Sequence, residues 1–199
     1  MVKDPHVSRR DFFRGRLQRP DASRARPSQL ALELLQRPPG AIAEGQFLSA
    51  CTRCGDCIEA CPPQALQKAP PEAGERRAGT PFIDAIRRAC VMCTDTPCIQ
   101  ACEPGVLRAE LPPVMATARI DPVACLPWQG QPCRMCVDQC PVPGAISTDS
   151  QGRPEIDPET CTGCGVCVQV CPAPRLAIEH RPLQSRPFWS MPPSDDQGV

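Results

Sequence analysis

The sequence predicts an α+β protein with little regular secondary structure, built from a repeated cysteine-rich unit. Sixteen of the 199 residues are cysteine, whereas aromatic residues make up only 4%. A cysteine content of about 8% is near that of cysteine-built scaffolds, and so few aromatic side chains cannot dominate a packed core. Cysteine chemistry must therefore supply part of the stability. The formal net charge of zero gives no whole-protein argument for binding nucleic acid or an anionic membrane.

The cysteines form a fourfold internal repeat, with none left over. The four groups are Cys51, Cys54, Cys57 and Cys61; Cys90, Cys93, Cys98 and Cys102; Cys125, Cys133, Cys136 and Cys140; and Cys161, Cys164, Cys167 and Cys171. The first and fourth read C-x2-C-x2-C-x3-C, the second C-x2-C-x4-C-x3-C and the third C-x7-C-x2-C-x3-C. Proline follows the last cysteine directly in all groups except the second, where Glu103 intervenes.

Three kinds of cysteine chemistry compete for this spacing. Disulfides suit a small secreted protein, but no apolar export segment is present near the N-terminus, and a reducing cytosol disfavours them. Zinc prefers two separated C-x2-C pairs. A [4Fe–4S] cluster takes closely spaced thiolates from one run and a fourth from elsewhere, as in the C-x2-C-x2-C-x3-C-P run of bacterial two-cluster ferredoxins. The spacing therefore predicts four [4Fe–4S] clusters with all sixteen cysteines as ligands, and no ligand role for His6 or His180.

The segments between the groups are predicted to form hairpins and short helices. Residues 144–157 read as strand, polar glycine turn and strand. Residues 65–68 can pair with residues 80–84 across a loop that contains Pro and Gly. Short helices are predicted at residues 58–60 and 168–170, each ended by the proline that follows the run.

The runs are expected to work in pairs, because the last thiol of each run normally binds the partner cluster. The two hairpins favour sequential pairing, and a nested pairing of group one with four and of two with three remains the alternative. Sequential pairing gives the ligand sets Cys51, Cys54, Cys57 and Cys102; Cys90, Cys93, Cys98 and Cys61; Cys125, Cys133, Cys136 and Cys171; and Cys161, Cys164, Cys167 and Cys140. Gly55 and Gly165 follow the second cysteine of their runs and are expected to let the backbone curl and turn N–H groups toward sulfur.

Residues 1–45 are predicted to form a basic arm. The first 27 residues hold eight Lys or Arg against three Asp. Within them, residues 8–13 (S-R-R-D-F-F) match the front of a twin-arginine export signal, but charged residues follow instead of an apolar segment. We therefore expect a pseudo-signal and a cytoplasmic protein. The arm is either simply solvated or docks an acidic partner, and residues 28–35 suit a short amphipathic helix.

Several stretches around the cysteines carry a family resemblance. They are residues 37–41 (R-P-P-G-A), 46–48 (Q-F-L), 79–83 (G-T-P-F-I), 93–98 (C-T-D-T-P-C) and 125–133 (C-L-P-W-Q-G-Q-P-C). Together with the runs they resemble the polyferredoxins of the NapF/NapG/MauM type, accessory iron–sulfur proteins of periplasmic nitrate reductase and methylamine dehydrogenase systems. Trp128, in the last of these stretches, is expected to cover the third cluster.

The resemblance implies two bacterial-ferredoxin-like (βαββαβ) dicluster modules in tandem, at residues 46–112 and 113–180. Residues 181–199 are rich in Pro and lack periodicity, which predicts a flexible tail. It implies relay of single electrons through the four clusters, to or within a respiratory system of the nitrate reductase or amine dehydrogenase type. A cytoplasmic maturation factor for an exported metalloenzyme is the alternative.

An electron carrier is expected rather than an enzyme, because no nucleotide loop, flavin fingerprint or catalytic triad is evident. Its partners would be redox proteins or a client metalloenzyme, and a membrane quinol-oxidising protein is one option. We expect no nucleic-acid partner, and no transmembrane segment in this protein. Sixteen thiolates and four oxidised cores of about +2 each would bring the loaded protein to a charge of about −8.

Overall fold

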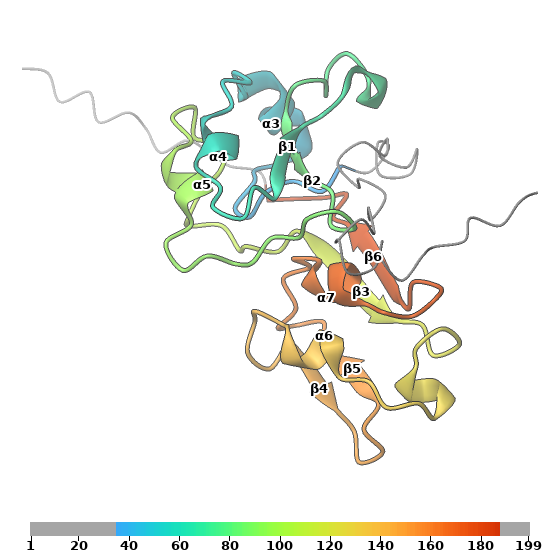
Figure 1. The fold of residues 1–199 in the computed structure, drawn as a ribbon. Helices are drawn as coiled ribbons and strands as arrows, with labels where there is room; N and C mark the ends of the chain where they lie inside the picture. Colours follow the sequence, from blue (N-terminus) through green and yellow to red (C-terminus); the bar gives the residue numbers. More distant parts are fainter. Residues whose placement is uncertain (1–34, 188–199) are drawn as a thin grey trace, which may run out of the picture.

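The computed structural model describes residues 35–187 (Figure 1). The basic arm before residue 35, with its pseudo-signal and predicted amphipathic helix, and the tail after residue 187 lie outside the described residues. Figure 1 shows two halves, with β3, β6 and α7 lying near the place where they meet. In each half, short helices and strands are joined by longer loops, as the low content of regular structure predicts.

The first half carries one hairpin between short helices. Its elements are α3 (Glu44–Ala50), α4 (Asp56–Glu59), β1 (Leu66–Lys68), a 3-10 helix (Pro71–Ala73), β2 (Pro81–Ile83) and α5 (Pro97–Gln100). Strands β1 and β2 pair antiparallel, with Leu66 opposite Ile83. This pairing confirms the hairpin predicted between residues 65–68 and 80–84.

The second half adds an outer pair of strands to the same pattern. Its elements are β3 (Ala116–Ile120), a 3-10 helix (Pro127–Gln129), α6 (Met135–Asp138), β4 (Ile146–Thr148), β5 (Pro154–Ile156), α7 (Val166–Val170) and β6 (Ile178–Pro182). Strands β4 and β5 form the predicted hairpin, and β3 pairs antiparallel with β6. Read along the chain, the order is strand, 3-10 helix, helix, strand, strand, helix, strand.

The first half has an isolated bridge where the second half has its outer strand pair. Ala41 and Leu107, which flank the helices and hairpin of this half in the chain, form an antiparallel bridge. Pro38 and Pro104 each lie three residues before a bridging residue, at positions that would face the other segment in a longer ladder. Because proline has no N–H to donate, neither position can supply a ladder hydrogen bond.

The two halves share a hydrophobic core. One buried cluster includes Phe47 and Leu107 of the first half, Met115 at the junction, and Cys164 and Val166 of the second half. The Phe47 and Met115 side chains have no exposed surface. The halves therefore pack against each other through their interiors, and are not separate units on a flexible linker.

Two elements cross the predicted segment boundaries. Helix α3 spans the boundary drawn between residues 45 and 46, and strand β6 spans the one drawn between residues 180 and 181. His180, at the end of the predicted second module, is part of β6, and its Nε2 lies 3.0 Å from the carbonyl oxygen of Gly163.

The glycines at the starts of two helices adopt the expected backbone. Gly55 and Gly165 have φ angles of 102° and 90° and directly precede α4 and α7. A side chain is disfavoured in this region of φ, which suits glycine to the curl at the cysteine run. The two helices that follow confirm the short helices predicted at residues 58–60 and 168–170.

Candidate metal centres

Four small cavities each gather four thiols. The first is lined by Cys51, Cys54, Cys57 and Cys102, the second by Cys61, Cys90, Cys93 and Cys98, the third by Cys125, Cys133, Cys136 and Cys171, and the fourth by Cys140, Cys161, Cys164 and Cys167. In every cavity, three thiols come from one run and the fourth comes from the other run of the same half. This is the grouping that sequential pairing requires, and we refer to the four groupings as the first to fourth thiol sets.

The short helices explain how each run serves two cavities. Helix α4 carries Cys57 of the first set, and Cys61 of the second set follows the end of the helix. The C-x3-C step between them spans about one helical turn, so the two thiols lie about 6 Å apart along the helix axis. Helices α5, α6 and α7 repeat the arrangement. The common ending of the four runs thus places each last thiol in the neighbouring cavity.

Apolar side chains complete the first and second cavities. Ile58 and Val106 line the first cavity, beside the four thiols of the set. Leu66 of β1, Ile83 of β2 and Met92 line the second. The β1–β2 hairpin therefore forms part of the wall of the second cavity.

The second half builds its cavities in the same way. Leu126 and Ile178 line the third cavity, and Ala118 of β3 and Ile146 of β4 line the fourth. The outer strand pair thus contributes to both, with β6 at the third cavity and β3 at the fourth. In both halves the thiols lie in surroundings that exclude much of the water.

The Trp128 ring does not line the third cavity, contrary to prediction. Its Nε1 donates a hydrogen bond to the carbonyl oxygen of Pro154 at 3.3 Å, and the Arg153 guanidinium lies over the ring at 4.3 Å. Pro154 lines the third cavity as well as the groove on which Trp128 lies. The indole is drawn to this position because its polar N–H finds an acceptor there.

Burial and mutual repulsion oppose the ionisation of five of the thiols in the absence of a cation. Burial, with a further contribution from neighbouring thiols, raises the pKa values of Cys57, Cys90 and Cys167 to about 12. The same causes raise those of Cys98 and Cys136 to about 11. Four thiolates can be held together in such a cavity only if a cationic centre compensates their charge, and its binding must release protons.

The donor chemistry of the cavities fits an iron–sulfur core. Backbone N–H groups point at thiol sulfurs, from Ala65 to Cys61 at 3.3 Å and from Gly163 to Cys161 at 3.4 Å. Such hydrogen bonds stabilise thiolate ligands and tune cluster potentials. Within residues 35–187, no group of three or more His, Cys, Asp or Glu side chains has the close geometry of a single-ion site. Each set of four thiols surrounds a cavity instead.

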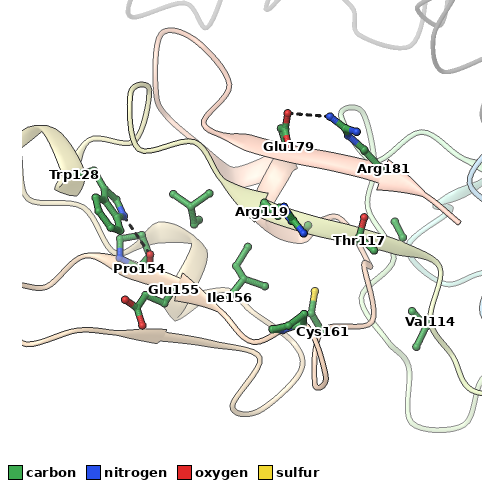
Figure 2. Close-up of a pocket in the computed structure, with 14 residues that line it drawn as sticks. Val114, Thr117, Arg119, Trp128, Pro154, Glu155, Ile156, Cys161, Glu179 and Arg181 are labelled. Carbon is green, nitrogen blue, oxygen red and sulfur yellow. Dashed lines mark hydrogen bonds and ion pairs between the residues drawn. The ribbon is translucent and has the colours of Figure 1, made fainter.

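A groove of about 570 Å³ lies beside the fourth thiol set. Figure 2 shows its lining residues on β3, β5 and β6, with Trp128 at one end, Val114 at the other and the Glu179–Arg181 ion pair along one edge. Cys161 is the one thiol that reaches it. The sequence did not predict this groove, because the groove forms only when β3 pairs with β6, a strand far along the chain.

The described helices include none with the length and apolar character needed to cross a membrane. A family model described as a 4Fe-4S dicluster domain matches residues 50–106 and 131–174. The first match covers the first two thiol runs, and the second covers most of the last two.

Ferredoxin-type proteins are similar over most of the chain. The methylamine utilization ferredoxin-type protein MauM of Methylobacillus flagellatus is 40% identical over 174 residues, which is 81% of this chain and 73% of that protein. The ferredoxin-type protein NapG of Escherichia coli is 38% identical over 163 residues, 74% of this chain and 70% of the relative. The ferredoxin-type protein NapF of Escherichia coli is 31% identical over 147 residues, 72% of this chain and 84% of the relative.

Thiol sets arranged in pairs, within segments that match a 4Fe-4S dicluster domain, define an iron–sulfur protein of the ferredoxin type. The chain belongs to the family of the MauM, NapG and NapF ferredoxin-type proteins. Its cofactors are [4Fe–4S] clusters, and an electron-transfer role is supported.

Proposed function

We propose that this protein relays single electrons through four [4Fe–4S] clusters, one in each thiol set, within two ferredoxin-like dicluster modules. The observation that carries the proposal is the presence of four cavities that each gather three thiols of one run and the last thiol of its partner run. This exchange of the last thiol is the arrangement of two-cluster ferredoxins. The sixteen cysteines are the proposed ligands.

The site favours electron transfer over bond-making chemistry. When bound, a cluster with four cysteine ligands supplies one-electron redox chemistry and has no open iron position for a substrate. The residues of this chain hold the thiols, exclude water with apolar side chains and direct N–H groups at sulfur. These features determine the potential and the distance between neighbouring centres.

Iron and sulfide analysis tests the number of clusters. Protein purified without oxygen should contain about 16 iron and about 16 acid-labile sulfide per chain if four cubane clusters are present. A colourless protein that contains zinc and no labile sulfide would exclude the proposal. A value near half of the expected iron would indicate that only one of the two modules holds clusters.

A pair of matched substitutions tests the ligand sets. Cys61→Ser should damage the centre of the second set, although Cys61 belongs to the first run. Cys102→Ser should damage the centre of the first set, although Cys102 belongs to the second run. EPR spectra of the reduced variants report which centre is lost. Loss of the centre of the variant's own run in both cases would exclude the exchange of ligands.

The physiological system is proposed from the relatives. A role in electron supply to or within a respiratory system, of the nitrate reductase or amine-oxidising type, is consistent with relatives named for methylamine utilization. The partners would be redox proteins, including a quinol-oxidising membrane protein, or a client metalloenzyme. Predicted cytoplasmic placement can be tested with a reporter that is active only after export.

The pseudo-signal at residues 8–13 favours a second candidate, a maturation factor for an exported metalloenzyme. The cofactor content of the client distinguishes the two functions. In a strain without this protein, a client that is fully loaded with cofactor but receives no electrons supports the relay. A client that lacks its cofactor supports maturation.

A further inference from the structure

We propose that electrons cross between the two halves at the contact between Cys90 and Cys164, so that the thiol sets act in the order first, second, fourth, third. This route differs from the order of the runs along the chain. It rests on the proposed function, since it requires a cluster in each set. The route follows from contacts that bring specific pairs of sets together, described in turn below.

The crossing point is a direct hydrogen bond between ligand residues of different halves. The backbone N–H of Cys90, in the second set, donates to the carbonyl oxygen of Cys164, in the fourth set, at 3.2 Å. A path from one centre to the other therefore needs only two ligand residues and one hydrogen bond.

Within each half, packed helices join the two sets. Helix α4 packs against α5, and these helices carry Cys57 of the first set and Cys98 of the second. Helix α6 packs against α7, and these carry Cys136 of the third set and Cys167 of the fourth. The first and third sets are thus each joined to the crossing point through a partner set.

Residues around the crossing point hold the two halves closely together. The side chain of Gln169 in α7 accepts a hydrogen bond from the N–H of Ala89 at 2.9 Å and donates one to the carbonyl oxygen of Arg87 at 3.4 Å. A Cβ at Gly165 would lie 2.4 Å from the Cβ of Ala85. Glycine at this position therefore lets the fourth run approach the first half.

The two ends of the route are open to partners. Cys54 is the exposed thiol of the first set. At the third set, Val123 and Met135 are 76% and 44% exposed and lie within two residues of Cys125 and Cys136 in the chain. An electron donor and an acceptor could therefore dock at opposite ends without competing for one surface.

Variants with two remaining centres test the route directly. Cys54→Ala/Cys133→Ala should remove the centres of the first and third sets and leave the second and fourth. Cys93→Ala/Cys161→Ala should do the reverse. In EPR spectra of the fully reduced proteins, we expect magnetic coupling between the two centres of the first variant and none in the second. Coupling between the first and third sets, or none between the second and fourth, would overturn the route.

Substitutions that leave every thiol in place provide a second test. Gln169→Ala and Gly165→Ala should weaken the coupling between halves and slow electron equilibration after flash reduction. The matched controls are Asp138→Ala, at the equivalent position of α6, and Gly55→Ala, whose added Cβ meets only the Lys68 side chain at 3.4 Å. Adding Ala85→Gly to Gly165→Ala should restore the coupling.

The outcomes separate this proposal from the proposed function. If Gln169→Ala and Gly165→Ala show the same coupling as their two controls, with four clusters present, the route is overturned and the relay stays intact. Protein without labile sulfide would instead overturn the relay itself.

Discussion

Replacing Arg37 should destabilise the protein strongly, although this residue touches no thiol. The Arg37 side chain is completely buried and forms a 2.6 Å ion pair with Glu44 at the start of α3. It also donates to the Thr80 hydroxyl at 2.8 Å and to the Pro81 carbonyl oxygen at 2.9 Å, and its guanidinium lies 4.6 Å from the centre of the Phe47 ring. One side chain thus joins the N-terminal segment, α3 and β2.

The expected loss can be worked out from these contacts. Arg37→Ala leaves the buried acceptors at Thr80 and Pro81 without their donor, at a cost of about 1–3 kcal/mol each. Burial opposes the ionisation of Glu44, but the hydrogen bonds and charge of Arg37 outweigh it and lower the pKa of this carboxyl group. Removing one partner of a buried pair typically costs about 3–5 kcal/mol. Because Glu44 is 32% exposed and can be rehydrated, the broken pair contributes the lower end of this range, and we expect a total loss of at least about 3 kcal/mol.

Bleaching of the cluster absorbance in urea under anaerobic conditions measures the effect. A loss of about 3 kcal/mol should lower the midpoint by more than about 1 M urea. Arg37→Lys should be intermediate, because an ammonium group cannot reproduce the bidentate pairing. The control is Arg134→Ala, which removes an exposed pair with Asp138 and should change stability by less than about 1 kcal/mol. Equal midpoints for Arg37→Ala and Arg134→Ala would refute the reasoning.

Three further predictions concern the centres themselves. Gly163→Ala should lose the iron of the fourth set, because the added Cβ would lie 2.1 Å from the carbonyl oxygen of Ala116. The control Gly152→Ala, at a similar φ of 77° but with no atom within 4 Å of the added Cβ, should keep its iron. Equal iron contents in the two variants would contradict this steric argument. Cluster insertion should become more favourable as pH rises from about 6 to about 9, since thiols whose pKa values are raised to about 12 must lose protons to bind iron. A yield of reconstituted cluster that does not change over this pH range would count against the prediction. Removing iron with a chelator should abolish most of the far-UV circular dichroism, because metal binding supplies folding free energy; a native-like spectrum of the iron-free protein would show that apolar packing suffices.

The features that could be predicted from the sequence are local ones. The hairpins are set by strand and turn residues within a few positions of each other, and β1–β2 and β4–β5 form as expected. The last thiol of each run reaches the neighbouring cavity because a four-residue step spans one helical turn. The two hairpins favoured sequential pairing over the nested alternative, and the sixteen thiols gather in four cavities in the groupings that sequential pairing gives.

The features that could not be predicted depend on distant segments. The pairing of β3 with β6 brings together residues on either side of two thiol runs, and places His180 in the body of the second half. The groove beside β3 follows from the same pairing. Arg37 carries no local signal of burial, since its partners Thr80 and Pro81 are contributed by β2 and the residue before it. Packing between distant segments decides these positions, and no local pattern encodes it.

Differences between the runs reflect the neighbours that each run has in the fold. The residue before the second cysteine is left-handed in three runs, with φ of 61° at Arg53, 53° at Met92 and 66° at Gly163. A left-handed backbone costs a non-glycine residue about 1–2 kcal/mol, which the first two runs evidently tolerate. Glycine at position 163 is therefore required by a neighbour, the Ala116 backbone, and not by φ alone.

The Arg53 side chain shows what the same position does when no neighbour crowds it. It donates hydrogen bonds at 3.0 Å to the carbonyl oxygens of Ala78 and Arg76, and so fixes the loop before β2. At Gly163 the carbonyl oxygen instead accepts a 3.0 Å hydrogen bond from the buried Gln36 side chain of the first half. The repeat thus builds the four thiol cavities, whereas Gly165 of the fourth run, which lies against Ala85 of the first half, allows the close contact that joins the second set to the fourth.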